Sequence, residues 1–465
     1  MMEKKTNRLV SNIKYYSLGV LSSKLVAFIF IPIYAAFIRP ESLGTYQYLY
    51  SIVSLVVPIV YQSVWEGMFR FSIVTIGKEL DVINTTTKYV IGLSLVYSLL
   101  FYFATCVLKF EYSGYLLGCG ISNAVISYWQ YAARALKANR EYATASILSA
   151  AVTLLSSIIL IVCLKWQIRA LFISNIVGTF SAAIYLEAKL RLINKCTTGR
   201  FDKELLFSIL KYSIPLAINS ISWWLVSSCN NIVVTKILGE HSNGIMAMAQ
   251  RFGSIFALVT SIISMAWQEE SFRTCYDTDR DAYFNKVLNI YIKSLFSSVL
   301  VLTPVTYLLY MFMVQGDYLN GVSLTSILYI IAAYNAIVTH LGSAFLTEGK
   351  SNILFWTTFI AGLLTLVFSI ILIHPFGLEG VLWATMLSCL INMFIRVRIL
   401  KKKMSIKINY IQLVILTIMC FAMTYICKSL GLNVIAQFIV LVVSCCGCIL
   451  YNKQLIEGFI KNVKH

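Results

Sequence analysis

Residues 353–373 read ILFWTTFIAGLLTLVFSIILI, and residues 380–395 read GVLWATMLSCLINMFI. Neither run contains a charged residue. An α-helix needs about 20 mostly apolar residues to cross the hydrocarbon core of a bilayer. The first run reaches that length and the second is slightly shorter. The short segment 374–379, which contains His, Pro, Gly and Glu, therefore predicts a turn between two membrane-spanning helices.

Apolar runs of this kind recur along most of the chain. Hydrophobic residues make up 59% of the 465 positions and charged residues only 12%, roughly half the charged share of a soluble domain. We therefore expect an all-α integral membrane protein with about 14 transmembrane helices. The other expected spans are 13–37, 45–65, 89–108, 113–133, 142–164, 170–187, 213–237, 244–267, 287–312, 322–345, 410–427 and 434–451.

The distribution of positive charge predicts the orientation. The chain carries 38 Lys and Arg residues against 20 Asp and Glu, a net charge of +18. Most of the basic residues fall in loops on one side of the expected spans, together with both chain ends, and Lys and Arg are enriched in cytoplasmic loops. Both termini are therefore expected in the cytoplasm. Because the charge lies in short loops and not on one folded basic surface, no nucleic-acid partner is expected.

The two halves of the chain carry similar segments. Residues 66–70 (EGMFR) follow the second expected span, and residues 269–273 (EESFR) follow the eighth. Glu, Phe and Arg match in order and at one fixed offset. Both halves begin on the same side of the membrane, so the repeat is parallel, with an axis along the membrane normal.

The repeat predicts two pseudo-symmetric six-helix lobes around a central cavity, plus two C-terminal helices. Two lobes with a binding site between them are typical of transporters that work by alternating access. The expected parts are an N-terminal lobe at 1–190, a cytoplasmic linker at 191–212, a C-terminal lobe at 213–400 and the additional helices with a cytoplasmic tail at 401–465.

Three basic residues fall inside expected spans and are candidate substrate-binding residues. Lys24 lies roughly 16 Å along the first span at 1.5 Å per residue, too deep for easy snorkelling, so we expect it to face a cavity. A contact with a carbonyl or hydroxyl of a neighbouring helix is the alternative. For Arg251 a cavity role and an outward snorkel are both open, and Lys293, near the cytoplasmic start of its span, is expected to snorkel.

Glu66 and Arg70 complete the set of candidate binding residues. Their spacing permits an interfacial ion pair in helical register, and their repetition in the second half also suggests a gating or portal role. Aromatic residues that could stack on sugars are Tyr34, Tyr61, Trp223 and Trp224, although a place in the interfacial belt or in packing is the favoured interpretation. His340 is expected to be a packing residue.

No Asp or Glu lies in the middle of an expected span. A cavity with Lys and Arg but no acid suits an anionic substrate such as a diphosphate, which Arg can bind bidentately. The 12 Cys show no metal-ligand spacing and read as small buried residues, so we expect no metal, no cofactor and no catalysis. The alternatives are a cation-coupled multidrug exporter, which needs an acid within the spans, and a membrane polymerase or glycosyltransferase, which needs a large external loop.

The sequence resembles the Wzx-type polysaccharide flippases of the multidrug/oligosaccharidyl-lipid/polysaccharide exporter superfamily. The resemblance rests on Tyr-Tyr-Ser at 15–17, Leu-Gly-Thr-Tyr at 43–46, Lys-Tyr-Ser-Ile-Pro-Leu at 211–216 and the 238–244 segment. Its 12+2 layout of spans also matches. One departure is Asn at 230 and 231, where family members often carry an Asp-Arg type pair.

The resemblance implies outward transfer of an undecaprenyl-diphosphate-linked oligosaccharide repeat unit across the bacterial cytoplasmic (inner) membrane. The product would serve O-antigen, capsule or a similar surface polysaccharide. Lys24 and Arg251 best match the basic cavity residues typical of the family. Membrane lipids are expected partners, with a polysaccharide polymerase and a chain-length regulator as possible further ones.

Overall fold

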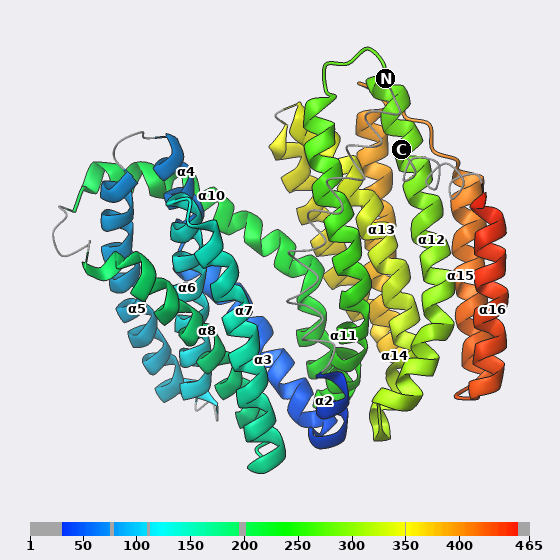
Figure 1. Ribbon diagram of the computed structural model, residues 1–465, viewed down its shortest axis with the longest axis horizontal. Helices are drawn as coiled ribbons and strands as arrows, with labels where there is room; N and C mark the ends of the chain where they lie inside the picture. Colours follow the sequence, from blue (N-terminus) through cyan, green and yellow to red (C-terminus); the bar gives the residue numbers. More distant parts are fainter. Residues whose placement is uncertain (1–29, 75–78, 109–111, 195–200, 349, 454–465) are drawn as a thin grey trace. The chain divides into compact units, whose positions relative to one another are not determined.

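A computed structural model describes residues 30–74, 79–108, 112–194, 201–348 and 350–453, which are mostly helical and contain no strand (Figure 1). The all-α class is thus confirmed. The helices are α2 Ile31–Phe37, α3 Pro40–Val60, α4 Val64–Val74, α5 Glu79–Leu108, α6 Ser113–Ala135, α7 Asn139–Ile158 with the π-helix η1 Ile159–Cys163, α8 Ile168–Leu190, α10 Lys203–Ser227, α11 Cys229–Arg273, α12 Arg280–Met313, the 3-10 helix η2 Gly316–Gly321, α13 Val322–Thr347, α14 Ser351–Leu400, α15 Tyr410–Leu430 and α16 Val434–Tyr451.

Within the described ranges, 11 helices are long and apolar enough to cross a membrane. Two of them, α11 and α14, are interrupted by non-helical backbone at Gly239 (φ 89°) and Gly377 (φ 57°). Left-handed φ values are open to glycine because it lacks a Cβ. Each of these long helices therefore contains two helical segments, as the paired spans at 353–373 and 380–395 predict. Helix α6 covers the expected span 113–133 but is not among the 11.

The second expected span differs from the structure. Helix α3 ends at Val60, and α4 starts at Val64 after a turn in which Gln62 and Ser63 have φ values of 52° and 45°. A right-handed helix cannot continue through left-handed residues. The apolar run at 45–65 is therefore divided by a break that the hydropathy pattern does not show.

The chain divides into two compact units. The N-unit is Phe37–Ile232 and holds α3 to α10. The C-unit combines residues 1–36 with Val233–His465, and the structure describes it at 30–36, 233–348 and 350–453. The division at Val233 falls inside the expected span 213–237, and α10 begins at Lys203, inside the stretch expected as a linker.

Helix α6 lies at the centre of the N-unit, where it contacts α3, α4, α5, α7 and α8. Its Tyr128 is fully buried, and the Tyr128 hydroxyl lies 2.8 Å from Thr86 Oγ1 and 2.7 Å from Thr87 Oγ1. Trp129 is also buried and donates its indole N–H to Glu187 at 2.9 Å. These hydrogen bonds satisfy polar groups that would be costly to leave unpaired inside a bilayer.

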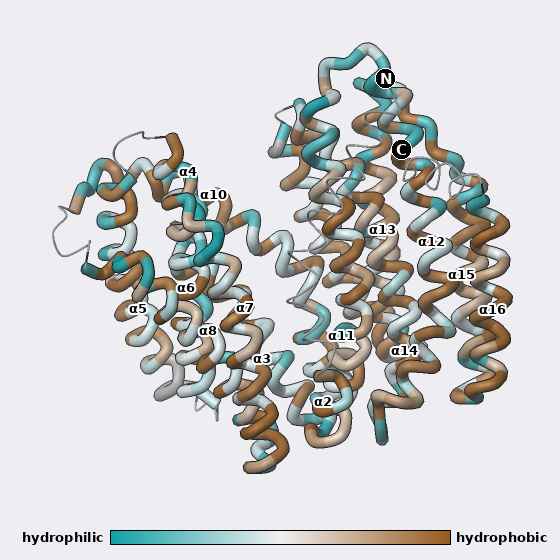
Figure 2. Tube along the Cα trace, in the orientation of Figure 1, coloured by the Kyte–Doolittle hydropathy of each residue, from teal (hydrophilic) through white to brown (hydrophobic). Residues whose placement is uncertain are grey.

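The C-unit is built around α12 and α13, whose side chains form most of its hydrophobic core. Helix α13 is buried along nearly its whole length by α12, α14 and α15. The C-terminal pair α15 and α16 packs on α12 and leaves its outer faces exposed and strongly apolar (Figure 2). These faces have the composition that contact with lipid requires.

Polar side chains on α12 hold the segment that leads to α15. Asp281 accepts a hydrogen bond from the Ser405 backbone N–H at 2.7 Å, and Asn285 accepts one from the Lys407 N–H at 2.7 Å. One turn further on, Asn289 donates to the Lys407 carbonyl at 3.0 Å. Residues 405–407 are not helical, so their backbone N–H and C=O groups need other hydrogen-bond partners. The three side chains of α12 provide them.

Candidate functional site

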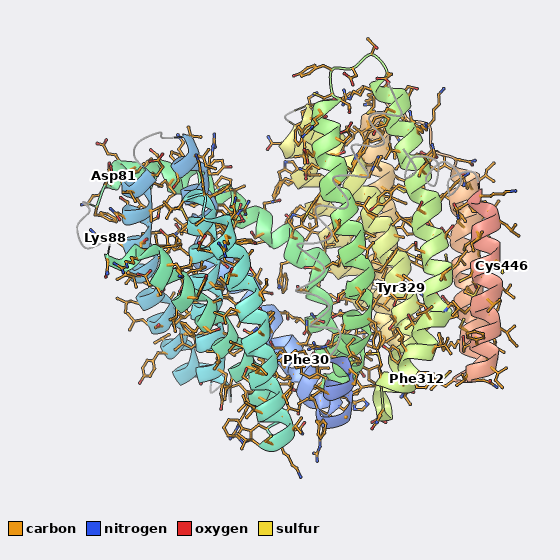
Figure 3. The ribbon with its side chains drawn as sticks, in the orientation of Figure 1. Phe30, Asp81, Lys88, Phe312, Tyr329 and Cys446 are labelled. Atoms are coloured by element: carbon orange, nitrogen blue, oxygen red, sulfur yellow. The ribbon has the colours of Figure 1, made fainter. Side chains whose placement is uncertain are left out.

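Arg251 lies on α11 in the C-unit, and its guanidinium carbon is 4.2 Å from the centre of the Tyr34 ring on α2. Tyr34 is buried, and its ring also lies 5.5 Å from that of Phe30, which Figure 3 labels. The N-terminal segment thus supplies an aromatic surface for the arginine. A cation above a ring face is attracted by the quadrupole of the ring.

Arg251 is half-buried, and among the described residues it forms no ion pair with a carboxylate. A guanidinium carries five N–H donors in a planar fork. When one face of that plane lies on a ring, the N–H groups at its edge can still bind an anion. Arg binds phosphate groups bidentately in this way. The arrangement can therefore hold a phosphate without first breaking a salt bridge.

Arg70 lies on α4 in the N-unit and has a similar partner. Its guanidinium carbon is 4.1 Å from the centre of the Tyr212 ring on α10. In the described chain no ion pair joins Glu66 to Arg70, although the second half does contain the corresponding Arg273–Glu269 pair. The interfacial ion pair that the spacing permits is therefore present in one half of the repeat only.

Arg134 joins the basic residues of the N-unit. Its guanidinium lies over the Phe69 ring at 4.7 Å and near the Tyr131 ring at 5.3 Å. The sequence places Arg134 in a cytoplasmic loop, where a basic residue needs no special explanation. Tyr131 lies three residues earlier on the same helix, α6, whereas Phe69 comes from α4, so only the Phe69 contact depends on the fold.

Lys293 has other surroundings. Its ammonium lies 5.4 Å from the centre of the Tyr451 ring at the end of α16. Lys293 therefore belongs to the side of α12 that carries the C-terminal pair, whereas Arg251 faces α2. Lys24 falls outside the described residues.

The aromatic residues considered as sugar contacts differ in exposure. Tyr61 is fully buried, and its hydroxyl lies 3.0 Å from Ser94 Oγ. Trp224 donates its indole N–H to the Ser51 carbonyl at 2.7 Å, and Trp223 is 54% exposed. Tyr61 is thus a packing residue, and Trp223 keeps an open ring.

His340 is buried in a group of rings. It stacks on Trp267 with ring centres 4.3 Å apart, and the Phe284 ring lies 4.8 Å away. These contacts agree with its prediction as a packing residue. Within the described ranges, no group of three or more His, Cys, Asp or Glu side chains could hold a metal ion.

Glu270 is a carboxylate that the hydropathy pattern does not single out. It lies near the end of α11 and is fully buried. From the sequence it belongs to an acidic pair in a cytoplasmic loop. Its burial follows from the extension of α11 to Arg273, beyond the expected span end at residue 267.

No protein-family model matches the sequence. An uncharacterized membrane protein of Methanocaldococcus jannaschii is 26% identical over 235 residues, which are 46% of this chain and 55% of that protein. The match thus spans only about half the length of this curated relative. It agrees with a multi-pass membrane protein and assigns no activity.

Solved structures share the fold. The lipid II flippase MurJ in an inward closed conformation superposes with a TM-score of 0.70 at 12% identity, over 95% of this chain and 99% of that one. An inward-facing MATE family multidrug resistance transporter of the MOP superfamily superposes with a TM-score of 0.66 at 13% identity, over 82% of this chain and 96% of that one. A MOP superfamily transporter from Pyrococcus furiosus superposes with a TM-score of 0.56 at 12% identity, over 86% of this chain and 96% of that one. The chain therefore has the MurJ/MATE-like fold.

Proposed function

We propose that this protein is a flippase of the Wzx type. It moves an undecaprenyl-diphosphate-linked oligosaccharide repeat unit from the cytoplasmic to the outer face of the bacterial cytoplasmic membrane, for O-antigen, capsule or a similar polysaccharide. The observation that carries the proposal is Arg251, held over Tyr34 without a carboxylate partner in the described chain. The fold it shares with the lipid II flippase MurJ supports a lipid-linked cargo.

The proposed mechanism is alternating access between two lobes, assigned to 1–190 and 213–400 and joined by the linker 191–212. The repeat of EGMFR and EESFR supports this assignment. Lys24 and Arg251 would hold the diphosphate of the cargo by charge-assisted hydrogen bonds. Arg70 and Glu66 would act at the cytoplasmic portal, where the cargo enters.

Binding of a short polyprenyl diphosphate to the purified full-length protein tests the proposal. Arg251→Gln removes the charge but keeps a polar side chain of similar size. A charge-assisted contact is worth about 1.5–3 kcal/mol, so the Kd should rise roughly 10-fold to 100-fold. Lys428→Gln is the control because Lys428 is exposed and already paired with Glu379, and it should leave the Kd unchanged. Equal affinity of wild type and Arg251→Gln for the diphosphate would remove the basis of the proposal.

A cation-coupled multidrug exporter is the second candidate. The fold shared with MATE transporters and the buried carboxylate of Glu270 favour it, because coupling to a cation commonly uses a buried acid. It predicts that Glu270→Gln abolishes efflux of cationic dyes from cells that express the protein. The flippase proposal predicts that cells expressing the wild-type protein show no such efflux.

A further inference from the structure

Five polar residues follow one another at four-residue intervals along α12 and form a stripe on it. Residues four apart lie about 40° apart around a helix, so such a stripe winds slowly round it. The first three members bind the backbone of the segment before α15, as described above. The last two reach α16. The stripe consists of Asp281, Asn285, Asn289, Lys293 and Ser297.

The last two members lie where α12, α15 and α16 meet. Ser297 Oγ accepts a hydrogen bond from the Asn452 amide at 2.8 Å, and the Ser297 carbonyl accepts one from the Cys448 thiol at 3.5 Å. Tyr451, beside Asn452, receives a hydrogen bond on its hydroxyl oxygen from the Gln412 amide. Three helices thus surround Lys293 at the end of the C-unit where the basic residues of the 401–407 segment gather.

Lys293 is the one member of the stripe whose charge no described carboxylate balances. Asp281, the acid of the stripe, is three turns away and is bonded to the Ser405 backbone. The ammonium lies against the Tyr451 ring, which stabilises a cation but leaves its N–H donors unused. The Tyr451 hydroxyl accepts from Gln412 and can still donate its own hydrogen. Donors from two helices are therefore available for one anion.

Exposed apolar side chains continue from this point along the C-terminal pair. Ile411 on α15 is 75% exposed, and Leu450 on α16 is 74% exposed. Further along α16, Cys446 is exposed as well (Figure 3). A ligand that occupied this place would meet a cation at one end and hydrocarbon along its length. That combination matches an anionic lipid more closely than a free ion.

We propose that Lys293 and Tyr451 bind the phosphate of an anionic phospholipid, whose acyl chains lie along α15 and α16. Charge complementarity selects this occupant, because the neighbouring 401–407 segment exposes Lys401, Lys402 and Lys407. The lipid is a constituent of the bilayer and not the transported cargo. Its effect is to hold the C-terminal pair against α12 at the membrane interface.

Native mass spectrometry of the purified full-length protein tests this proposal, with phosphatidylglycerol and phosphatidylcholine of identical acyl chains as probes. Wild type should retain one phosphatidylglycerol in preference to phosphatidylcholine. Lys293→Gln should weaken that retention about fivefold, the effect of one basic residue at a membrane surface, and Lys293→Arg should preserve it. Lys286→Gln, which alters an exposed lysine on the same helix, should behave as wild type.

Tyr451→Phe provides a second variant if Lys293→Gln does not fold. It keeps the ring and removes the hydroxyl donor, so retention should fall about twofold, the lower end expected for one hydrogen bond. Equal retention of phosphatidylglycerol by Lys293→Gln and wild type would overturn the proposal. So would equal retention of the two lipids by wild type, or full displacement of the lipid by inorganic phosphate. None of these results depends on whether the protein transports a lipid-linked saccharide.

Discussion

Arg251 and Arg396 are both arginines within apolar helices, and their side chains have different partners. Arg251 lies half-buried over one ring. Arg396 on α14 is 3% exposed, and its guanidinium donates to Thr357 Oγ1 at 3.1 Å, to the Val338 carbonyl at 2.7 Å and to Thr358 Oγ1 at 3.0 Å. Arg396 thus joins α13 to both segments of α14, whereas Arg251 keeps donors for a ligand.

Replacement of Arg396 should depend on volume more than on charge. Both threonine hydroxyls also donate to the Leu354 carbonyl, at 3.1 and 2.8 Å, so loss of the guanidinium leaves them bonded. Buried ion groups are often replaceable by apolar residues of similar size. Arg396→Met should change the free energy of unfolding by no more than about 1 kcal/mol.

Arg396→Ala, in contrast, leaves a cavity and should cost about 2–4 kcal/mol. Thermal unfolding of both variants in detergent, followed by circular dichroism, compares them with wild type. If Arg396→Met loses as much stability as Arg396→Ala, the charge itself stabilises this junction.

Tyr34 should contribute to cargo binding through its ring alone. A half-exposed cation above a ring gains roughly 1 kcal/mol, about fivefold in affinity. Tyr34→Leu should therefore raise the Kd for a polyprenyl diphosphate about fivefold, while Tyr34→Phe should leave it within twofold. Titration of the purified variants with the diphosphate measures both. If Phe weakens binding as much as Leu, the hydroxyl and not the ring face is the important group.

At the scale of elements, the C-terminal pair depends on the segment at 404–408 that connects it to α14. Asn285 contributes most to this segment, since its amide donates to the Ser405 carbonyl and its carbonyl accepts from the Lys407 N–H. Each such bond contributes about 1 kcal/mol. Loss of the Asn285 side chain would leave two backbone groups of the segment without their partner.

Asn285→Leu should therefore release the 404–408 segment while the core of the C-unit stays folded. Hydrogen–deuterium exchange of the amides at 404–408 should accelerate by roughly 10-fold or more, as expected for the loss of about two hydrogen bonds. Lys286→Leu, at the exposed neighbouring position, serves as control. Unchanged exchange in Asn285→Leu would show that packing alone holds the segment.

Three basic residues from different elements converge on Glu348, just after α13. Its carboxylate accepts hydrogen bonds from Lys350 at 3.0 Å and Lys403 at 3.1 Å, and Arg280 lies 3.9 Å away. Partial burial raises the pKa of Glu348, but the hydrogen bonds and charges of Lys350 and Lys403 outweigh burial, so the pKa is below its ordinary value. The ionised carboxylate therefore holds the ends of α12, α13 and α14 together.

The lowered pKa predicts a pH dependence of stability. A group whose pKa is lower in the folded state stabilises the fold above its ordinary pKa, near 4.5, and loses that contribution as the pH falls through the lower folded-state value. The melting temperature of wild type should therefore fall between about pH 5 and pH 3 by more than that of Glu348→Gln. Parallel pH profiles of the two proteins would contradict this role.

At the scale of the whole molecule, the fold class and most helix boundaries follow from the sequence. A run such as 434–451 has to be a helix in lipid, because nothing else satisfies its backbone groups there, and α16 has these bounds. The breaks do not follow so simply. Left-handed backbone at Gln62 and Ser63 divides an apolar run without any Gly or Pro at those two positions.

The candidate site could be predicted only in part. The depth of Arg251 in its span marks it as unusual before its neighbours are known. Its partner Tyr34 lies more than 200 positions earlier, and such a pairing depends on how α2 and α11 pack. Likewise, the contact of Arg134 with the Phe69 ring depends on packing between α4 and α6. Hydropathy reports the environment of a residue along its own helix and not its neighbours on other helices.

Reconstitution of the purified protein into proteoliposomes tests the central claim most directly. A fluorescent polyprenyl-diphosphate-linked oligosaccharide in both leaflets is exposed to a membrane-impermeant quencher, and the protected fraction is followed with time. We expect wild type to make the inner-leaflet pool accessible, and Arg251→Gln to slow this at least 10-fold while Lys428→Gln does not. Persistent protection of the inner pool in wild-type vesicles that do transport cationic dyes would contradict the account.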